Sequence, residues 1–176
     1  MDAIPYEIER KYLIRYPDLS RLELEAARSE IVQTYLVRPE DGGRSRVRKR
    51  STNGKTTYTH TVKKRVNELR SEEWEREIDE EEYARLLKAA DPERATLHKT
   101  RYCLPYRGHV FEIDVYPFWK DRAVMEVELR SEDEAAPLPP EIEVVREVSG
   151  EKEYSNSSLA KRLAKLQKET EEAERM

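Results

Sequence analysis

The chain has few of the residues on which several common kinds of active site depend. It contains one cysteine, three histidines and five glycines among 176 residues. The single cysteine, Cys103, cannot form an internal disulfide, so we expect a reducing, cytoplasmic environment. The scattered histidines with one cysteine argue against a zinc site, and so few glycines argue against a glycine-rich phosphate loop. No Ser-His-Asp or Cys-His arrangement can be proposed either.

Long apolar runs and an excess of one charge are also missing. Neither an apolar segment near the N-terminus nor a run long enough to cross a bilayer occurs, so we expect neither export nor membrane insertion. The 33 basic and 37 acidic residues nearly cancel, leaving a net charge of −4. This balance excludes a polycation that coats nucleic acid and argues against nucleic acid as the partner, but it leaves room for a local basic site.

What the chain does have is a regular alternation of apolar and polar residues, with 40% of its residues charged. Its length suits one domain over residues 1–176. Short turns between consecutive strands, including the Asn-Gly pair at 53–54, favour an antiparallel sheet that closes into a barrel, in the α+β class. Helices are expected at 17–29, 79–90 and 157–176, an irregular stretch at 132–156, and strands at 4–14, 31–38, 44–50, 56–65, 72–78, 97–106, 109–118 and 123–131.

The charges in these strands recur at every second position. In the first strand Glu7, Glu9 and Lys11 alternate with residues such as Ile8 and Tyr12. For one strand the simplest interpretation is a solvated face and an apolar face towards the core. A small barrel filled by the apolar faces would also be normal. The pattern nevertheless repeats over six or seven strands, and the charges come as carboxylate pairs or basic pairs, which favours an inverted barrel with a charged interior and an apolar outer wall under the helices.

An interior of this kind indicates a definite chemistry. Eight carboxylates and six basic groups lie on the matching strand faces, which sums to 6 − 8 = −2. Basic groups bind phosphate oxygens, and carboxylates bind hard cations such as Mg²⁺ or Mn²⁺. Without a metal the interior would repel a multiply charged phosphate, and a divalent cation would reverse that sign. We therefore expect a polyphosphate bridged to Mg²⁺ or Mn²⁺, if the barrel is inverted.

The ordered motifs of the chain resemble one known family. The segment EIERK at 7–11 fits the ExExK signature of the CYTH, or triphosphate tunnel metalloenzyme, superfamily, and RVR, TVK, EEWEREI, KTRY, FEIDVY, MEVE and EVSGEKEYSNSSLA follow in the family's order. The blocks cover nearly the whole chain and look most like the short bacterial members. The resemblance implies an eight-stranded antiparallel tunnel that acts on triphosphates with Mg²⁺ or Mn²⁺, and a C-terminal helix (157–176) that can plug one end.

The resemblance also implies roles for individual residues, and the chemistry of phosphoryl transfer suits them, because it needs charge neutralisation and alignment more than covalent help. Metal would be bound by Glu7, Glu9, Glu126 and Glu128, and catalysis would involve Glu9, Glu128 and Lys11. Phosphate oxygens would be held by Lys11, Arg46, Arg48, Lys63, Lys99, Arg101 and Lys152. Supporting roles, such as positioning basic groups or a second metal, would fall to Glu73, Glu75, Glu112, Asp114 and Tyr154. Other basic residues of these runs, Lys49, Arg50 and Arg65, are interpreted as surface.

The function expected from these features is a metal-dependent triphosphatase, with inorganic tripolyphosphate as the substrate that the short members indicate. Thiamine triphosphate and nucleoside triphosphates stay open, because no residues that would hold an organic group can be identified. Adenylyl cyclisation is a further enzymatic alternative, and a non-catalytic module that binds polyphosphate or an RNA 5′-triphosphate is the alternative outside enzymes. The sequence also leaves a homodimer open, since a partner subunit could cover part of the apolar strand faces.

Overall fold

A computed structural model describes residues 5–39 and 42–176 of the chain. Ile4, which falls in the first expected strand, and residues 40–41 lie outside the described residues. The strands are β1 (Tyr6–Arg15), β2 (Ala27–Tyr35), β3 (Arg44–Thr52), β4 (Lys55–Arg65), β5 (Arg70–Ile78), β6 (Leu97–Tyr106), β7 (His109–Val115), β8 (Arg122–Leu129) and β9 (Val144–Glu147).

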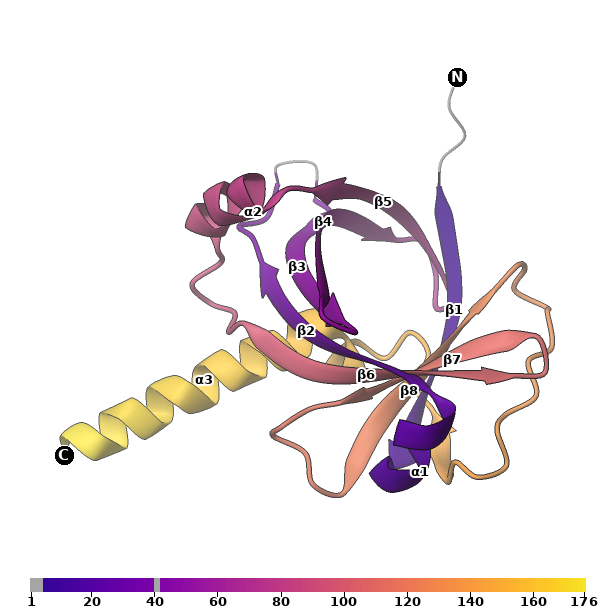
Figure 1. The fold of residues 1–176 in the computed structure, drawn as a ribbon. Coiled ribbons are helices and arrows are strands. Elements are labelled where there is room, and N and C mark those ends of the chain that lie inside the picture. Colours follow the sequence, from indigo (N-terminus) through magenta and orange to yellow (C-terminus); the bar gives the residue numbers. More distant parts are fainter. Residues whose placement is uncertain (1–4, 40–41) are drawn as a thin grey trace.

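The strands form one antiparallel sheet that closes on itself. Their order is β5-β4-β3-β2-β6-β7-β8-β1, and β1 also pairs with β5, so the predicted eight-stranded barrel is confirmed (Figure 1). One edge of β1 pairs with β8 from Ile8 to Arg15. The other edge of β1 pairs with β5 near the start of β1 and with the short β9 near its end. The first strand therefore joins three parts of the chain.

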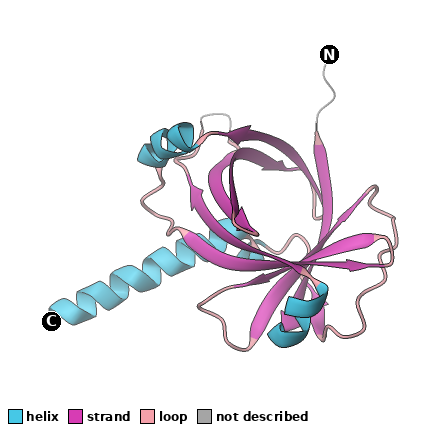
Figure 2. Cartoon of the chain, in the orientation of Figure 1, coloured by secondary structure: helices cyan, strands magenta, loops and turns pink. Residues whose placement is uncertain are grey.

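Three α-helices accompany the barrel: α1 (Leu19–Glu25), α2 (Glu80–Leu86) and α3 (Asn156–Arg175), with short 3₁₀ turns η1 (Leu87–Ala89) and η2 (Lys152–Tyr154) (Figure 2). Asp79, the N-cap of α2, accepts a hydrogen bond from the backbone N–H of Glu82, which satisfies a donor that the helix itself leaves free. In Figure 1, α3 starts at the barrel and runs away from it, and the buried residues of this helix, Leu159, Ala160 and Ala164, all lie in its first half. Among the described residues no helix is both long and apolar enough to span a bilayer.

The hydrophobic core lies on the outer wall of the barrel, as the inverted arrangement requires. Residues of β1, β6, β7 and β8 that alternate with the charged positions, such as Ile14, Phe111 and Met125, are fully buried. Leu22 of α1 and Ile142 of the segment before β9 cover this wall. On the other side of the barrel, Tyr83 of α2 and its neighbours pack against β3 and β5. The inner faces are therefore free to carry charge.

Two local expectations were wrong. The helix expected at 17–29 ends at Glu25, and β2 begins at Ala27 where residue 31 was expected, because residues 27–33 pair with β6 in a continuous ladder. Tertiary pairing here overrides the helix propensity of the Glu- and Ala-rich segment. The stretch 132–156, expected to be irregular, contains β9. This strand pairs with β1, and no local sequence pattern predicts that pairing.

Candidate active site in the barrel interior

The carboxylates expected to bind metal lie together on the inner faces of β1 and β8. In the antiparallel register Glu9 is directly opposite Glu128, and Lys11 is directly opposite Glu126. The Nζ of Lys11 forms an ion pair with Glu126 at 3.2 Å. Side chains paired across neighbouring strands in this way have their Cβ atoms only about 5 Å apart. The pairing of β1 with β8 thus brings together side chains that are more than a hundred residues apart in the sequence.

Lys63 of β4 reaches the same carboxylates from across β5. Its Nζ lies 2.6 Å from Oε1 of Glu7 and 3.5 Å from Oε1 of Glu9. Glu73 of β5, opposite Lys63 in the register, lies 3.9 Å away. Although burial opposes its charge, the carboxylates of Glu9 and Glu7 raise the pKa of Lys63. The single positive charge of Lys63 is therefore shared by three carboxylates, so this part of the interior has an excess of negative charge.

Because positive charge is in short supply here, the pKa values of several of these carboxylates are raised. Burial and the neighbouring Glu126 raise the pKa of Glu9, and burial with Glu7 raises that of Glu128. Burial, a hydrogen bond to Glu7 and its charge raise the pKa of Glu73 to about 8. Burial alone would raise the pKa of Glu126 too, but Lys11 and Arg101 hold it low. The first three carboxylates are those that an added cation would stabilise.

A second group of charges is built by β6 and β7. Lys99 and Arg101 point inward from β6, and both bind Asp114 of β7: Lys99 Nζ lies 2.8 Å from Oδ2 and Arg101 Nε 2.8 Å from Oδ1. Glu112 accepts a further hydrogen bond from Arg101 at 2.5 Å. Asp114 and Glu112 therefore orient basic groups, one of the two supporting roles expected for them. Burial and the charge of Arg101 lower the pKa of Lys99 to about 7, although Asp114 opposes this shift.

The inner face of β3 is a row of arginines without carboxylates. Arg46 and Arg48 are joined there by Arg50, and none of the three forms an ion pair with a carboxylate in the described part of the chain. Arg48 donates only to Gln33, and the buried Nε of Arg46 has no partner among the described residues. Burial and the charges of Arg46 and Arg101 lower the pKa of Arg48 to about 10. A buried donor without a partner costs about 1–3 kcal/mol, so this wall is arranged for an anion.

One end of the barrel interior is occupied by the start of α3. Leu159 and Ala160 are buried in one cluster with Tyr35 of β2, Leu97 of β6, Val124 of β8 and Tyr116, which directly follows β7. Asn156 accepts hydrogen bonds from Tyr116 and, at 3.5 Å, from Lys99, and the carbonyl of Tyr154 accepts one from Lys11 at 3.2 Å. The first residues of the helix and the turn before it therefore contact the same lysines that line the interior.

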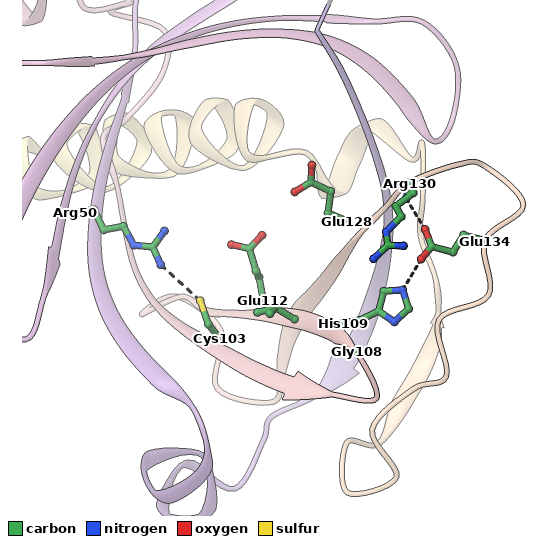
Figure 3. A pocket seen from close by; sticks show the side chains of 9 residues that line it. Arg50, Cys103, Gly108, His109, Glu112, Glu128, Arg130 and Glu134 are labelled. Atoms are coloured by element: carbon green, nitrogen blue, oxygen red, sulfur yellow. Dashed lines mark hydrogen bonds and ion pairs between the residues drawn. The ribbon is translucent and has the colours of Figure 1, made fainter.

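The opposite end is a pocket of about 300 Å³, which we call the mouth. Its lining includes Arg50, His109, Glu112, Glu128, Arg130 and Glu134. Figure 3 shows the Arg50 guanidinium on one side of this space and the carboxylates of Glu112 and Glu128 pointing into it. His109 Nε2 lies 2.9 Å from Glu134 Oε1. No Phe, Tyr or Trp is among the described residues that line the mouth.

The structure brings nearly all of the sequence-predicted residues to one interior. Glu75, although exposed, accepts a hydrogen bond from the buried Thr61 inside the barrel. Two residues differ: Lys152 lies in η2 with an exposed side chain and takes part in none of the ion pairs of the described interior. The ring of Tyr154 lies against Trp119 and Arg146, and it is the backbone carbonyl of Tyr154 that contacts Lys11. Arg50 was interpreted as surface, and this was wrong, since it lines the mouth. Its position two residues after Arg48 was the signal that could have found it. Lys49 and Arg65 are exposed as expected.

The carboxylates fit a hard divalent cation by their chemistry. Among the described residues no three His, Cys, Asp or Glu side chains stand close enough to form a complete metal site. Mg²⁺ seldom needs one, because it is usually bound by one or two carboxylates together with water and the phosphates of a substrate. Glu9 and Glu128, opposite each other and short of positive charge, are the pair that this mode of binding requires.

Comparison with known proteins identifies a family and relatives for the chain. The model of the CYTH domain matches residues 5–164. The chain is 35% identical over 158 residues to a protein of Nitrosomonas europaea named inorganic triphosphatase, covering 88% of this chain and 96% of that one.

Solved structures share the fold. A crystal structure of an inorganic triphosphatase is 31% identical, with a TM-score of 0.54, and covers 92% of this chain and 96% of that chain. A protein from Pyrococcus horikoshii is 23% identical with the same TM-score and covers 72% of this chain and 80% of its own; at this identity the likeness concerns the fold alone. Because the family model matches most of its length and a relative is 35% identical over 158 residues, the chain belongs to the CYTH domain family.

Proposed function

We propose that this protein is a metal-dependent triphosphatase that hydrolyses inorganic tripolyphosphate to pyrophosphate and phosphate. The observation that carries the proposal is the division of the barrel interior into two walls. Arginines that form no ion pair with a described carboxylate line β3, and carboxylates with raised pKa values line β1 and β8. A triphosphate with a divalent cation would supply the missing charge to both walls. The similarity to an inorganic triphosphatase supports the same activity.

The basic side chains would hold and align the substrate. Arg46 and Arg48 would grip phosphate oxygens with their planar guanidinium groups, and Arg101 would do so in the orientation that Asp114 and Glu112 give it. Lys63 and Lys99 would add point charges from either side. Lys11, held between Glu126 and the Tyr154 carbonyl, would stabilise the charge that develops on the departing phosphate.

The carboxylates of β1 and β8 would provide the second half of the chemistry. Mg²⁺ or Mn²⁺ bound by Glu7, Glu9, Glu126 and Glu128 would neutralise phosphate charge when present. Glu9 and Glu128 would also orient a water molecule for in-line attack on the terminal phosphorus. Without a cation, burial and neighbouring carboxylates raise the pKa values of both glutamates, and a bound cation would offset this shift and keep both carboxylates ionised. Glu73 and Glu75 would serve as supports that fix Lys63 and Thr61.

An inorganic substrate suits the two ends of the tunnel better than a nucleotide. We infer that α3 acts as the expected plug, since Leu159 and Ala160 fill the interior at that end. An organic group would then have to lie in the mouth, where the described lining offers charged side chains and no large aromatic ring for stacking. This favours tripolyphosphate over ATP or thiamine triphosphate.

The test is phosphate release from tripolyphosphate and from ATP, with Mg²⁺, Mn²⁺ or EDTA, in the wild type and in Glu9→Gln. We expect metal-dependent release from tripolyphosphate, poor release from ATP, and a loss of turnover of at least about a hundredfold in the variant. Calorimetry should show that Glu9→Gln still binds tripolyphosphate, because the basic wall is intact. Binding without turnover in the wild type would instead identify a non-catalytic polyphosphate-binding module.

A further inference from the structure

The row of arginines on β3 continues beyond the residues that a triphosphate needs. Arg46, Arg48 and Arg50 occupy alternate positions of one strand and therefore point to the same side. At a rise of about 3.3 Å per residue, the row from Arg46 to Arg50 is about 13 Å long. Three linked phosphates are shorter than this row, so they leave its last member without a phosphate.

The neighbouring strands explain why the whole row is free of carboxylates. On the β2 side the three arginines face Tyr35, Gln33 and Ile31, and on the β4 side they face Thr61, Thr59 and Thr57. Every one of these six partners is neutral. Tyrosine, glutamine and threonine can accept hydrogen bonds from a guanidinium without cancelling its charge. The three arginines from Arg46 to Arg50 therefore keep their positive charge, and Arg44, which precedes them on the same face, is opposite Lys63.

Arg50 itself is held in place by neutral groups. Its Nε donates to the Ser29 hydroxyl at 3.1 Å, and its NH2 group lies 3.5 Å from the Cys103 sulfur. Neither contact removes the charge of the guanidinium. Figure 3 shows that this group faces the open space of the mouth, across from the carboxylates of Glu112 and Glu128. The same two-wall arrangement as in the deeper interior is thus repeated at the mouth.

The two ends of the barrel fix the direction in which a longer chain could extend. At one end, buried residues of α3 fill the space between β2, β6 and β8. At the other end, the mouth is an open pocket of about 300 Å³ at the opposite ends of β6, β7 and β8. Phosphates beyond the third would have to extend towards the mouth, where Arg50 is the next member of the row.

We propose that Arg50 forms a subsite for a fourth phosphate, so that the protein accepts linear inorganic polyphosphates longer than triphosphate, tetrapolyphosphate first among them. The proposal rests on the function inferred above and extends it to chain length. A charge-assisted hydrogen bond from Arg50 to the added phosphate gives the longer chain an advantage that disappears when the guanidinium is removed. We expect the ligand to carry no organic group at the mouth, because charged side chains line most of this pocket.

The experiment compares tetrapolyphosphate with tripolyphosphate in the wild type, in Arg50→Gln and in Lys49→Gln. Lys49 is the adjacent residue on the outer face and is exposed, so it is the matched control. The readout is the ratio of kcat/KM for tetrapolyphosphate to that for tripolyphosphate. We expect Arg50→Gln to lower this ratio about tenfold, the effect of one lost charge-assisted hydrogen bond, and Lys49→Gln to leave the ratio as it is. Arg50→Lys, which keeps the charge but loses the fork, should fall between them.

A binding measurement separates this proposal from the proposed function. In the Glu9→Gln background, calorimetry with each polyphosphate reports affinity without turnover, and the same selectivity ratio should fall when Arg50→Gln is added. Selective binding without hydrolysis in the wild type would overturn the triphosphatase and leave the fourth subsite standing. Hydrolysis of tripolyphosphate with an Arg50→Gln ratio equal to that of the wild type would overturn the subsite alone. Circular dichroism and thermal unfolding establish that each variant is folded.

Discussion

Lys99 and Asp114 form an ion pair in the barrel interior, with Nζ 2.8 Å from Oδ2 and side chains that are 0% and 1% exposed. Asp114 holds Arg101 as well, so one carboxylate fixes two of the basic groups that would bind phosphate. A buried carboxylate with two cations is stabilised strongly in its charged form, and the pKa of Asp114 is lowered to about 2 although burial opposes this shift.

The first prediction concerns the loss of this carboxylate. Asp114→Asn keeps the shape of the side chain but leaves two buried cations with too little negative charge, and the free energy of unfolding should fall by about 3 kcal/mol or more. Urea unfolding measures the change. Glu112→Gln is the matched control, because Glu112 binds Arg101 but is 29% exposed, and its loss should be clearly smaller. Equal losses in the two variants would contradict the central role of Asp114.

A second prediction follows from the pKa of Lys99, which burial and Arg101 lower to about 7. Above that pH the amine of the free protein becomes neutral, and phosphate binding must then take up a proton. Affinity for tripolyphosphate should therefore fall as pH rises through 7, by at most about tenfold per pH unit. Lys99→Arg removes this dependence, because arginine stays charged.

The measurement is calorimetric binding to Glu9→Gln and to Glu9→Gln/Lys99→Arg, between about pH 6 and pH 8. The ligand has the same protonation states in both experiments, so the ratio of the two dissociation constants isolates the lysine. A ratio that does not change with pH would show that Lys99 remains protonated over this range.

A third prediction tests the contact between α3 and the barrel. Leu159 is 3% exposed and packs against inward residues of the strands, so Leu159→Ala should lower the free energy of unfolding by about 2–4 kcal/mol. Leu166 lies on the same helix but is 56% exposed, and Leu166→Ala should change it by less than about 0.5 kcal/mol. Hydrogen exchange should rise in residues 152–160 of the Leu159 variant alone. Exchange that stays unchanged there would mean that α3 is held by other contacts.

The position of most interior residues could be read from the sequence because strand periodicity is a local property. Once Glu7, Glu9 and Lys11 alternate with apolar residues in a strand, they must share a face, whatever the strand pairs with. The same holds for Glu112 with Asp114 and for Glu126 with Glu128. Arg50 obeys the same parity and was missed only because a basic run at a strand end is commonly a solvated surface.

Other features depended on contacts between distant segments. The early start of β2 follows from its ladder with β6, and β9 exists because β1 offers it a free edge beyond β5. Lys152 lies in a turn whose side-chain directions are fixed by the docking of α3 and not by a strand pattern.

The sequence by itself determined that two opposite kinds of charge alternate with apolar residues in strand after strand, because side chains of a strand point to its two faces in turn. Only the tertiary structure decided which carboxylate meets which lysine, since the register of β1 with β8 and the reach of Lys63 across β5 arise from barrel closure. Closure also decided that the charged faces turn inward. On the outside, α1, α2 and the segment before β9 pack against the apolar faces of the strands. This burial of apolar surface favours the inverted barrel.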